Sequence, residues 1–341
     1  MLTAELAEPL APAEVARRVA ALTTQYPHLG PAPGVRVVDP DDWTTVRDEY
    51  AAVGYRPNSP LIRFAVRDRV GGLIIAAHHG AVDGLGLLAL LSAALDAPVT
   101  STAIGVADRA AATSFSASTA SRLGSALGRP AVRVAPAGRR GTPGTEVLVS
   151  ASLPATAMGT ADLVCAAASA VQVWNSARAD KAGSLHVAIG ASRVGGAAPT
   201  PVDDSTLLRL RLPCSSTVDR ERVVRELADA TPRPDVPRLA GRLAGVARLL
   251  LPNIASPSFL LSNLGRVNGP ESLRGLAFYP VGGGRDAVAF GALTVADSTS
   301  VTARVRGGGF DPTSAATLLD GLVRHLPVQH RDSAETGGHD S

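Results

Sequence analysis

Residues 71–95 read GGLIIAAHHGAVDGLGLLALLSAAL, and this stretch decides the fold. The run from Leu73 to Ala77 is apolar, partly β-branched and preceded by two glycines, which predicts a strand covered on both faces. From Gly84 onward, closely spaced leucines and alanines predict a buried helix. The stretch therefore predicts an interior strand that leads into a helix after a short turn.

Polar groups occupy the turn between this strand and this helix. His78 and His79 end the strand, Gly80 breaks it, and an aspartate, Asp83, precedes the helix. Because side chains alternate along a strand, we expect one imidazole to face a cavity and the other to pack inside. Two interpretations stand: structural histidines with Asp83 as a helix N-cap, or a reactive site in which the carboxylate orients an imidazole. Adjacent imidazoles at a buried strand end are costly to desolvate unless they are hydrogen-bonded or take part in a reaction.

Residues 78–84, HHGAVDG, match every fixed position of the HHxxxDG motif, and here the sequence resembles the condensation-domain and chloramphenicol-acetyltransferase-like acyltransferases. The resemblance implies an α/β fold of two lobes, each a mixed sheet flanked by helices, with a tunnel between them. It implies that His79 faces the reacting groups and that His78 is a packed neighbour. It also implies an orienting role for Asp83, a place for Gly84 at the substrate, and an acyl thioester donor.

Composition limits the function classes. The chain has 341 residues, enough for two domains, with 45% hydrophobic and 18% charged residues. The formal charge is +3, aromatics make up 4%, and no basic run is interleaved with aromatics, which argues against nucleic acid as a partner. Two distant cysteines, Cys165 and Cys214, predict neither a disulfide framework nor a metal site, and they fit a reducing cytoplasm. The apolar runs are too short for a membrane span, and the first residues do not resemble a secretory signal.

The pattern divides the chain into an amino-terminal lobe at residues 1–140, a carboxy-terminal lobe at 141–326 and a disordered tail at 327–341. In the first lobe we expect strands at 2–10, 35–38, 61–66 and 73–77, helices at 13–22 and 84–91, and a helix start at 40–43. In the second lobe we expect strands at 145–150, 185–190, 259–265, 287–295 and 300–306 and helices at 160–178 and 318–326.

The passage between the lobes, residues 96–144, is rich in small residues and is expected to cross or cover the tunnel, with a helix near 113–127. Arg139 and Arg140 near its end are candidates for the phosphates of a CoA or phosphopantetheine donor, and a solvated loop pair is the other interpretation. Gly282 to Arg285 lacks the sequel of a nucleotide loop.

Two further sites lie in the second half. The strand at 185–190 runs into Arg193, and the family pattern pairs such an arginine with the motif aspartate, here Asp83. The strand at 259–265 ends in Ser262 and Asn263, and it resembles the SNLG-like signature of the same acyltransferases. These two side chains are candidate contacts to a carbonyl or an acceptor, and a capped strand with an Asn turn is the alternative.

The sequence therefore predicts an acyltransferase that moves an acyl group from a thioester to a hydroxyl or amine of a small molecule, in natural-product or lipid biosynthesis. His79 is the expected base, and direct transfer is expected because the motif has no Ser or Cys nucleophile. The donor is acyl-CoA or an acyl- or peptidyl-carrier protein, acting as co-substrate, with no permanently bound cofactor and no metal. A condensation-like cyclase, another repurposed tunnel enzyme and a non-catalytic binding module are the alternatives.

Overall fold

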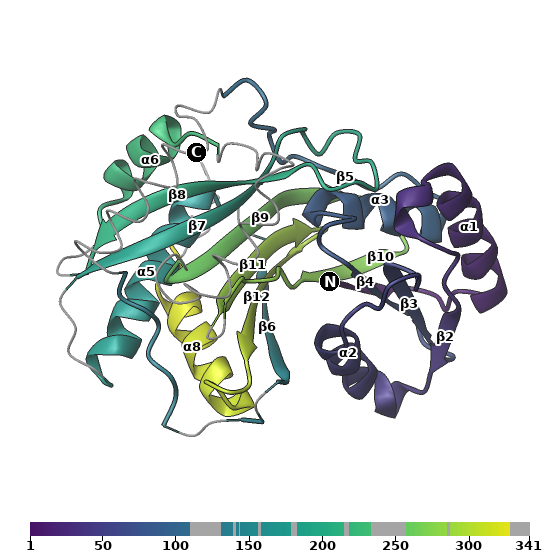
Figure 1. The fold of residues 1–341 in the computed structure, drawn as a ribbon, viewed down its shortest axis with the longest axis horizontal. Helices are drawn as coiled ribbons and strands as arrows, with labels where there is room; N and C mark the ends of the chain where they lie inside the picture. The colour runs from purple at the N-terminus through teal and green to yellow at the C-terminus, as the bar shows by residue number, and fades with distance from the viewer. Residues whose placement is uncertain are drawn as a thin grey trace, which may run out of the picture.

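Two mixed β-sheets, each flanked by helices, form two lobes of the protein (Figure 1). The structure is a computed structural model, and it describes residues 1–109, 131–138, 141–142, 144–155, 158–178, 183–214, 218–232, 257–284 and 287–327. The α/β architecture of two lobes predicted from the sequence is confirmed.

The amino-terminal lobe contains a five-stranded sheet with strand order β10-β1-β4-β3-β2. Its strands are β1 (Leu2–Leu6), β2 (Val35–Val38), β3 (Ile62–Arg67), β4 (Gly72–Ala77) and β10 (Leu273–Phe278). Its helices are α1 (Pro12–Gln25), η1 (Pro27–Leu29), η2 (Pro40–Asp42), α2 (Trp43–Ala52) and α3 (Gly84–Leu95).

Helices cover both faces of this sheet, which explains the unbroken apolar run in β4. Leu73 and Ile75 belong to the same apolar cluster as residues of α1 and α3. Ile74 and Ala76, on the other face, pack with Val46 of α2. The predicted strand and the predicted helix after it are therefore confirmed, and the covered strand places the motif at the lobe's centre.

The carboxy-terminal lobe contains a seven-stranded sheet in which six strands follow the order β6-β12-β11-β9-β7-β8, while β5 pairs with β9. Its strands are β5 (Thr100–Ser101), β6 (Glu146–Pro154), β7 (Ser184–Ser192), β8 (Ser205–Pro213), β9 (Phe259–Asn268), β11 (Val288–Val295) and β12 (Ser298–Arg306). The helices described in this lobe are α5 (Thr160–Ser176), α6 (Arg220–Asp229) and α8 (Pro312–Arg324).

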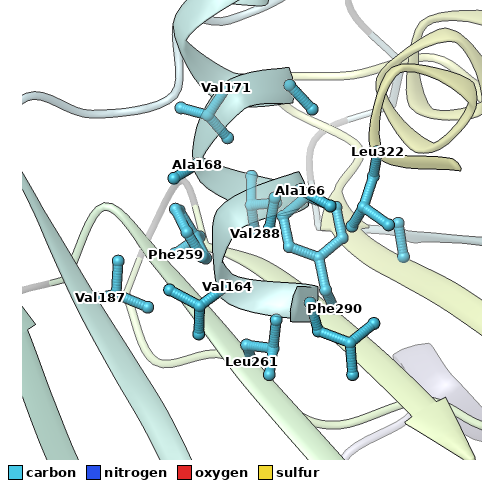
Figure 2. Packing of buried hydrophobic residues seen from close by; sticks show 14 of the residues in the cluster. Val164, Ala166, Ala168, Val171, Val187, Phe259, Leu261, Val288, Phe290 and Leu322 are labelled. Atoms are coloured by element: carbon cyan, nitrogen blue, oxygen red, sulfur yellow. The ribbon is translucent and has the colours of Figure 1, made fainter. Parts of the chain in front are cut away.

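One face of this sheet carries the core of the lobe (Figure 2). Val164 and Val171 of α5 and Leu322 of α8 pack over Phe259 of β9 and Phe290 of β11. The two phenylalanine rings meet edge to face with centroids 5.7 Å apart, a geometry that adds about 1 kcal/mol to the burial of their area. Since side chains alternate along the strands, the opposite face is left for contacts with the amino-terminal lobe.

Two strands cross between the lobes, which the expected division at residue 140 did not anticipate. β10 follows β9 in the chain but pairs with β1, and β5 follows α3 but pairs with β9. Strand partners far apart in sequence leave no local pattern, so the contiguous division into 1–140 and 141–326 does not describe how the sheets are assembled.

Other differences have local causes. β8, α6 and β10 were not predicted, and α8 begins at Pro312 because Asp311 caps it, where we expected a start at 318. The helix expected at 113–127 and the tail beyond residue 327 lie outside the described residues.

Candidate functional site

The two motif histidines lie in the turn that follows β4. The strand ends at Ala77, one residue before His78, and both imidazoles are exposed. The His78 backbone N–H donates to the Leu61 carbonyl at 2.8 Å, and the His78 carbonyl accepts from Ala81 at 2.9 Å. The expectation that strand alternation would pack one histidine inside is therefore wrong, because the strand stops before it reaches them.

His78 is nevertheless held in one orientation. Its Nδ1 accepts a hydrogen bond from the Gly80 backbone N–H at 3.2 Å. Its ring meets the ring of Tyr55 edge to face, with centroids 5.5 Å apart. His79 forms no hydrogen bond or ring contact with any residue that the structure describes. The turn thus combines one oriented imidazole with one whose nitrogens are available to a reactant.

Tyr55 is a site residue that the sequence analysis missed. The Arg63 guanidinium lies 4.1 Å from the centre of its ring, and it also donates to the carbonyls of Val53 and Gly54 at 2.7 Å. The Tyr55 hydroxyl is buried and has no hydrogen-bond partner among the described residues. Burial raises the pKa of Tyr55 to about 12, against the opposing effect of the Arg63 and Arg304 charges. No motif marks this tyrosine, because it lies in an irregular loop after α2.

Asp83 joins the two lobes. Its carboxylate is buried, accepts from the Gly86 backbone N–H at 2.7 Å and thereby caps α3. The other carboxylate oxygen accepts from the Ser192 hydroxyl at the end of β7, 3.3 Å away. Burial raises the pKa of Asp83, the charges of Asp203 and Asp204 add to the shift, and its two hydrogen bonds oppose it.

The expected pairing of Asp83 with Arg193 is not what the structure shows. The carboxylate instead accepts a hydrogen bond from Ser192, the residue before Arg193, and Arg193 follows the end of β7. The Arg193 backbone N–H donates to the Asp204 carbonyl at 2.9 Å. Since neighbouring residues on a strand point to opposite faces, a shift of one residue replaces an arginine by a serine.

The loop that connects β7 to β8 reaches across to the motif. The Asp83 N–H donates to the Val202 carbonyl at 3.1 Å, and Nε2 of His28 lies 2.9 Å from the Pro201 carbonyl. A Cβ added at Gly86 would lie 2.8 Å from the Val202 carbonyl oxygen, so only glycine permits this approach. His28 therefore helps to hold the second lobe against the first.

Gly84, expected at the substrate, lies between apolar side chains. A Cβ there would lie 3.0 Å from Leu264 of β9 and 3.1 Å from Phe278 of β10. The structure gives this glycine a packing role at the meeting of the lobes, and its contact with substrate stays a prediction.

Ser262 and Asn263 face opposite sides of the carboxy-terminal sheet. Ser262 pairs in register with Gly291, whose own partner Thr302 donates to the carbonyl of Phe278 in β10, so this face looks toward the amino-terminal lobe. Asn263 lines a cavity of about 360 Å³ beside the start of α5, and neither motif histidine lines it. The two residues therefore do not act on one carbonyl together.

Other expected contacts fall outside the description. Arg139 and Arg140 lie outside the described residues, so their meeting with donor phosphates remains a prediction. Within the described ranges, no group of three or more His, Cys, Asp or Glu side chains is placed to hold a metal ion. In the same part of the chain, every helix is too short or too polar to cross a membrane.

Comparison with known proteins identifies the fold. No family model and no curated protein matches the sequence. Among solved structures, the first condensation domain of the calcium-dependent antibiotic synthetase is similar at a TM-score of 0.63 and 16% identity, over 95% of this chain and 89% of that one. The epimerization domain from the third module of tyrocidine synthetase B is similar at 0.57 and 12%, over 96% and 91%.

A third structure is the starter condensation domain of rhizomide synthetase, a mutant in complex with C8-CoA and Leu-SNAC. Its TM-score is 0.57 at 11% identity, over 96% of this chain and 88% of that one. All three likenesses span nearly the whole of both chains at low identity. The protein therefore has the same two-lobed fold as these condensation and epimerization domains.

Proposed function

We propose that the protein is an acyltransferase that moves an acyl group from a thioester to a hydroxyl or amine of a small molecule. The observation that carries the proposal is His79, an exposed imidazole without a described partner, at the strand-to-helix turn of a complete HHxxxDG sequence. The condensation-domain fold supports it, because the same turn then lies where two lobes meet. Natural-product or lipid biosynthesis is the proposed setting.

The proposed reaction is a direct transfer. The lone pair of the acceptor oxygen or nitrogen attacks the thioester carbonyl carbon while the His79 imidazole takes the acceptor's proton. The tetrahedral intermediate then collapses, the C–S bond breaks, and the imidazolium returns the proton to the departing thiolate. An ester or amide and a free thiol are the products, so no outside reactant is needed and the imidazole returns to its starting state.

The neighbouring residues have supporting roles in this proposal. His78 is held by Gly80 and Tyr55 and fixes the turn that carries His79. Asp83 caps α3 and ties the turn to Ser192, so it supports the fold and does not exchange protons with substrate. Ser262, on the face directed to the amino-terminal lobe, is the candidate donor to the carbonyl oxygen.

A CoA thioester is the preferred donor, and an acyl group on a carrier protein is the alternative. The rhizomide starter domain, which has the same fold, is described in complex with C8-CoA, so this fold accommodates such a thioester. A carrier protein would present the same phosphopantetheine arm.

A second candidate is a reaction without transfer, such as cyclisation. The likeness to an epimerization domain supports this candidate, because that domain has the same fold and is named for a reaction other than acyl transfer. A non-catalytic binding module is the third candidate, and it predicts no turnover with any thioester.

A thioester assay separates these candidates. Acetyl-CoA and octanoyl-CoA are offered with a panel of alcohols and amines, thiol release is followed, and products are identified by mass spectrometry. His79→Ala should lower the transfer rate about 100-fold or more at an unchanged melting temperature. His325→Ala, at an exposed histidine after α8, is the matched control and should retain full activity. Full transfer by folded His79→Ala would rule out the base, and no thiol release by the wild type with any acceptor would favour the second or third candidate.

A further inference from the structure

The cavity beside Asn263 is separate from the histidine turn and has a chemical character of its own. It has a volume of about 360 Å³, within the range of small-molecule sites, and opens where the ends of β9, β11 and β12 meet the start of α5. Met158, Leu163 and Leu293 form apolar parts of its wall.

The cavity lies between the carboxy-terminal sheet and the start of α5, and its lining comes from both apolar clusters. Leu163 belongs to the apolar cluster of the carboxy-terminal lobe, whereas Leu293 belongs to that of the amino-terminal lobe. Gly265, which also lines the cavity, follows Leu264, and Leu264 packs against Gly84 at the first turn of α3. Because neighbouring residues alternate along β9, the strand itself lies between the cavity and α3.

The polar groups that line the cavity have unused hydrogen-bond donors. Asn263 uses its carbonyl oxygen to accept from the Gly265 N–H at 2.9 Å, but its amide nitrogen only approaches the Met158 carbonyl, at 3.5 Å. The Thr102 hydroxyl accepts from the Arg266 N–H at 3.0 Å, and its proton has no acceptor among the described residues. The exposed Arg266 guanidinium makes one described hydrogen bond, to Ala296 at 3.2 Å.

Two further hydroxyls at the cavity are paired with each other. The hydroxyls of Thr294 and Thr299 bond each other at 2.9 Å. No acidic side chain is among the described residues that line the cavity, and Asp162, at the start of α5, is paired with Arg220. A site that offers donors and a guanidinium, with apolar walls, fits a ligand that carries acceptors and a negative end.

We propose that this cavity binds a narrow chain that bears carbonyl groups and ends in an anion, with Asn263 and Thr102 at the carbonyls and Arg266 at the anion. Two sources share this chemistry: the phosphopantetheine arm of a thioester donor, and an acceptor that ends in a carboxylate. The inference deepens the proposed acyl-transfer function and rests on it for its biological meaning, but the binding itself is measured without turnover.

Calorimetric titration of the full chain with CoA, pantetheine and octanoate tests the proposal. Arg266→Gln should weaken binding of the anionic probe about tenfold or more, and added salt should weaken wild-type binding. Asn263→Asp keeps the oxygen that accepts from Gly265, replaces the donor by a second carboxylate oxygen and should weaken binding at least as much. Arg274→Gln, at an exposed arginine of β10 that does not line the cavity, is the matched control and should bind as the wild type does.

The probes distinguish the two sources. CoA binding that exceeds pantetheine binding, without octanoate binding, identifies the phosphate-bearing arm, whereas octanoate binding without CoA binding identifies a carboxylate acceptor. Unchanged affinities in both Asn263→Asp and Arg266→Gln, or no binding of any probe at millimolar concentration, would overturn the proposal. Repeating the titrations in His79→Ala separates the two conclusions. If the probes bind as expected but the protein transfers no acyl group, only the proposed function is wrong. If transfer depends on His79 but the cavity variants bind as the wild type does, only this inference is wrong.

Discussion

The Asp83 carboxylate accepts a hydrogen bond from the Ser192 hydroxyl across 3.3 Å, and this contact joins the first turn of α3 to the end of β7. With its other oxygen on the Gly86 N–H, the carboxylate is fully engaged in holding the lobes together. The motif aspartate therefore sets the position of the turn that carries His79, and the proposed function assigns the proton transfer to the imidazole alone.

The first prediction concerns the charge of Asp83. Asp83→Asn retains an oxygen for the Gly86 N–H and should be as stable as the wild type or more so at pH 7, whereas Asp83→Ala should lose about 1 kcal/mol with the cap. Because the folded-state pKa is raised, the folded protein binds the proton more tightly than the unfolded chain. Wild-type stability should therefore fall relative to Asp83→Asn as the pH rises through the ordinary carboxyl range.

Urea unfolding of the three proteins across this pH range measures the effect. Equal losses in Asp83→Asn and Asp83→Ala at pH 7 would show that the negative charge itself supports the fold.

The second prediction concerns the buried carboxylate of Glu146, which is bonded by both Arg304 and Arg306. Arg304 is 9% exposed and also donates to the Ala51 carbonyl of α2 at 3.0 Å, so it links the lobes, whereas Arg306 is 37% exposed. Arg304→Met should cost about 3 kcal/mol of unfolding free energy, because it removes the buried partner of the carboxylate and the bond to α2 and leaves only the partly exposed Arg306. Arg306→Met should cost about 1 kcal/mol or less.

Chemical denaturation of both variants decides the point. Similar losses from Arg304→Met and Arg306→Met would mean that Glu146 has no preferred partner and that the contact with α2 does not contribute to stability.

The third prediction separates two tyrosines whose rings both lie near the Arg63 guanidinium. The Tyr50 hydroxyl donates to the Phe64 carbonyl at 3.2 Å, so Tyr50→Phe should cost about 1 kcal/mol. The Tyr55 hydroxyl is buried without a described partner, so Tyr55→Phe should leave the stability unchanged or raise it, while the ring contacts with Arg63 and His78 persist. Thermal unfolding of the pair, side by side, is the measurement; a loss in Tyr55→Phe equal to that in Tyr50→Phe would reveal a structural bond to this hydroxyl.

The fourth prediction is an acid sensitivity at His186 of β7. Burial lowers the pKa of His186, and the nearby Arg211 and Arg209 lower it further. The unfolded chain therefore takes up this proton first as the pH falls, so the stability that neutral His186 provides is complete above the ordinary histidine pKa and is lost below it. His186→Leu should make unfolding free energy less dependent on pH between about pH 7 and about pH 5.

Parallel stability curves for the wild type and His186→Leu over that interval would contradict this. The other histidines are present in both proteins, so the difference between the two curves isolates the contribution of His186.

The sequence was informative wherever a physical signal is local. The apolar run of β4, the helix after Asp83 and the strands β11 and β12 were all predicted from the sequence. β8 was not predicted although its sequence carries a strand signal: buried Leu208, Leu210 and Leu212 alternate with exposed arginines. β10 lacks such a signal, since a short strand with an internal glycine shows its role only once its partner β1 is known.

The sequence supplied the residues of the candidate site, but it did not predict their contacts. His78, His79 and Asp83 follow from the motif, yet the exposure of both histidines depends on where β4 ends, and boundaries are poorly fixed by propensity. The partner of Asp83 depends on strand register, where one residue changes arginine to serine. Tyr55 comes from an irregular loop, and only the fold brings its ring to His78.

The pairing of β10 with β1 also sets an order of events during synthesis. Until residues 273–278 have emerged from the ribosome, β1 can pair with β4 on one side only, and its other edge stays open. The five-stranded sheet must wait until the residues between β1 and β10 have been made, at translation rates of about 5–20 residues per second. A chaperone that shields an unpaired strand edge would therefore be most useful to this protein before β10 is available.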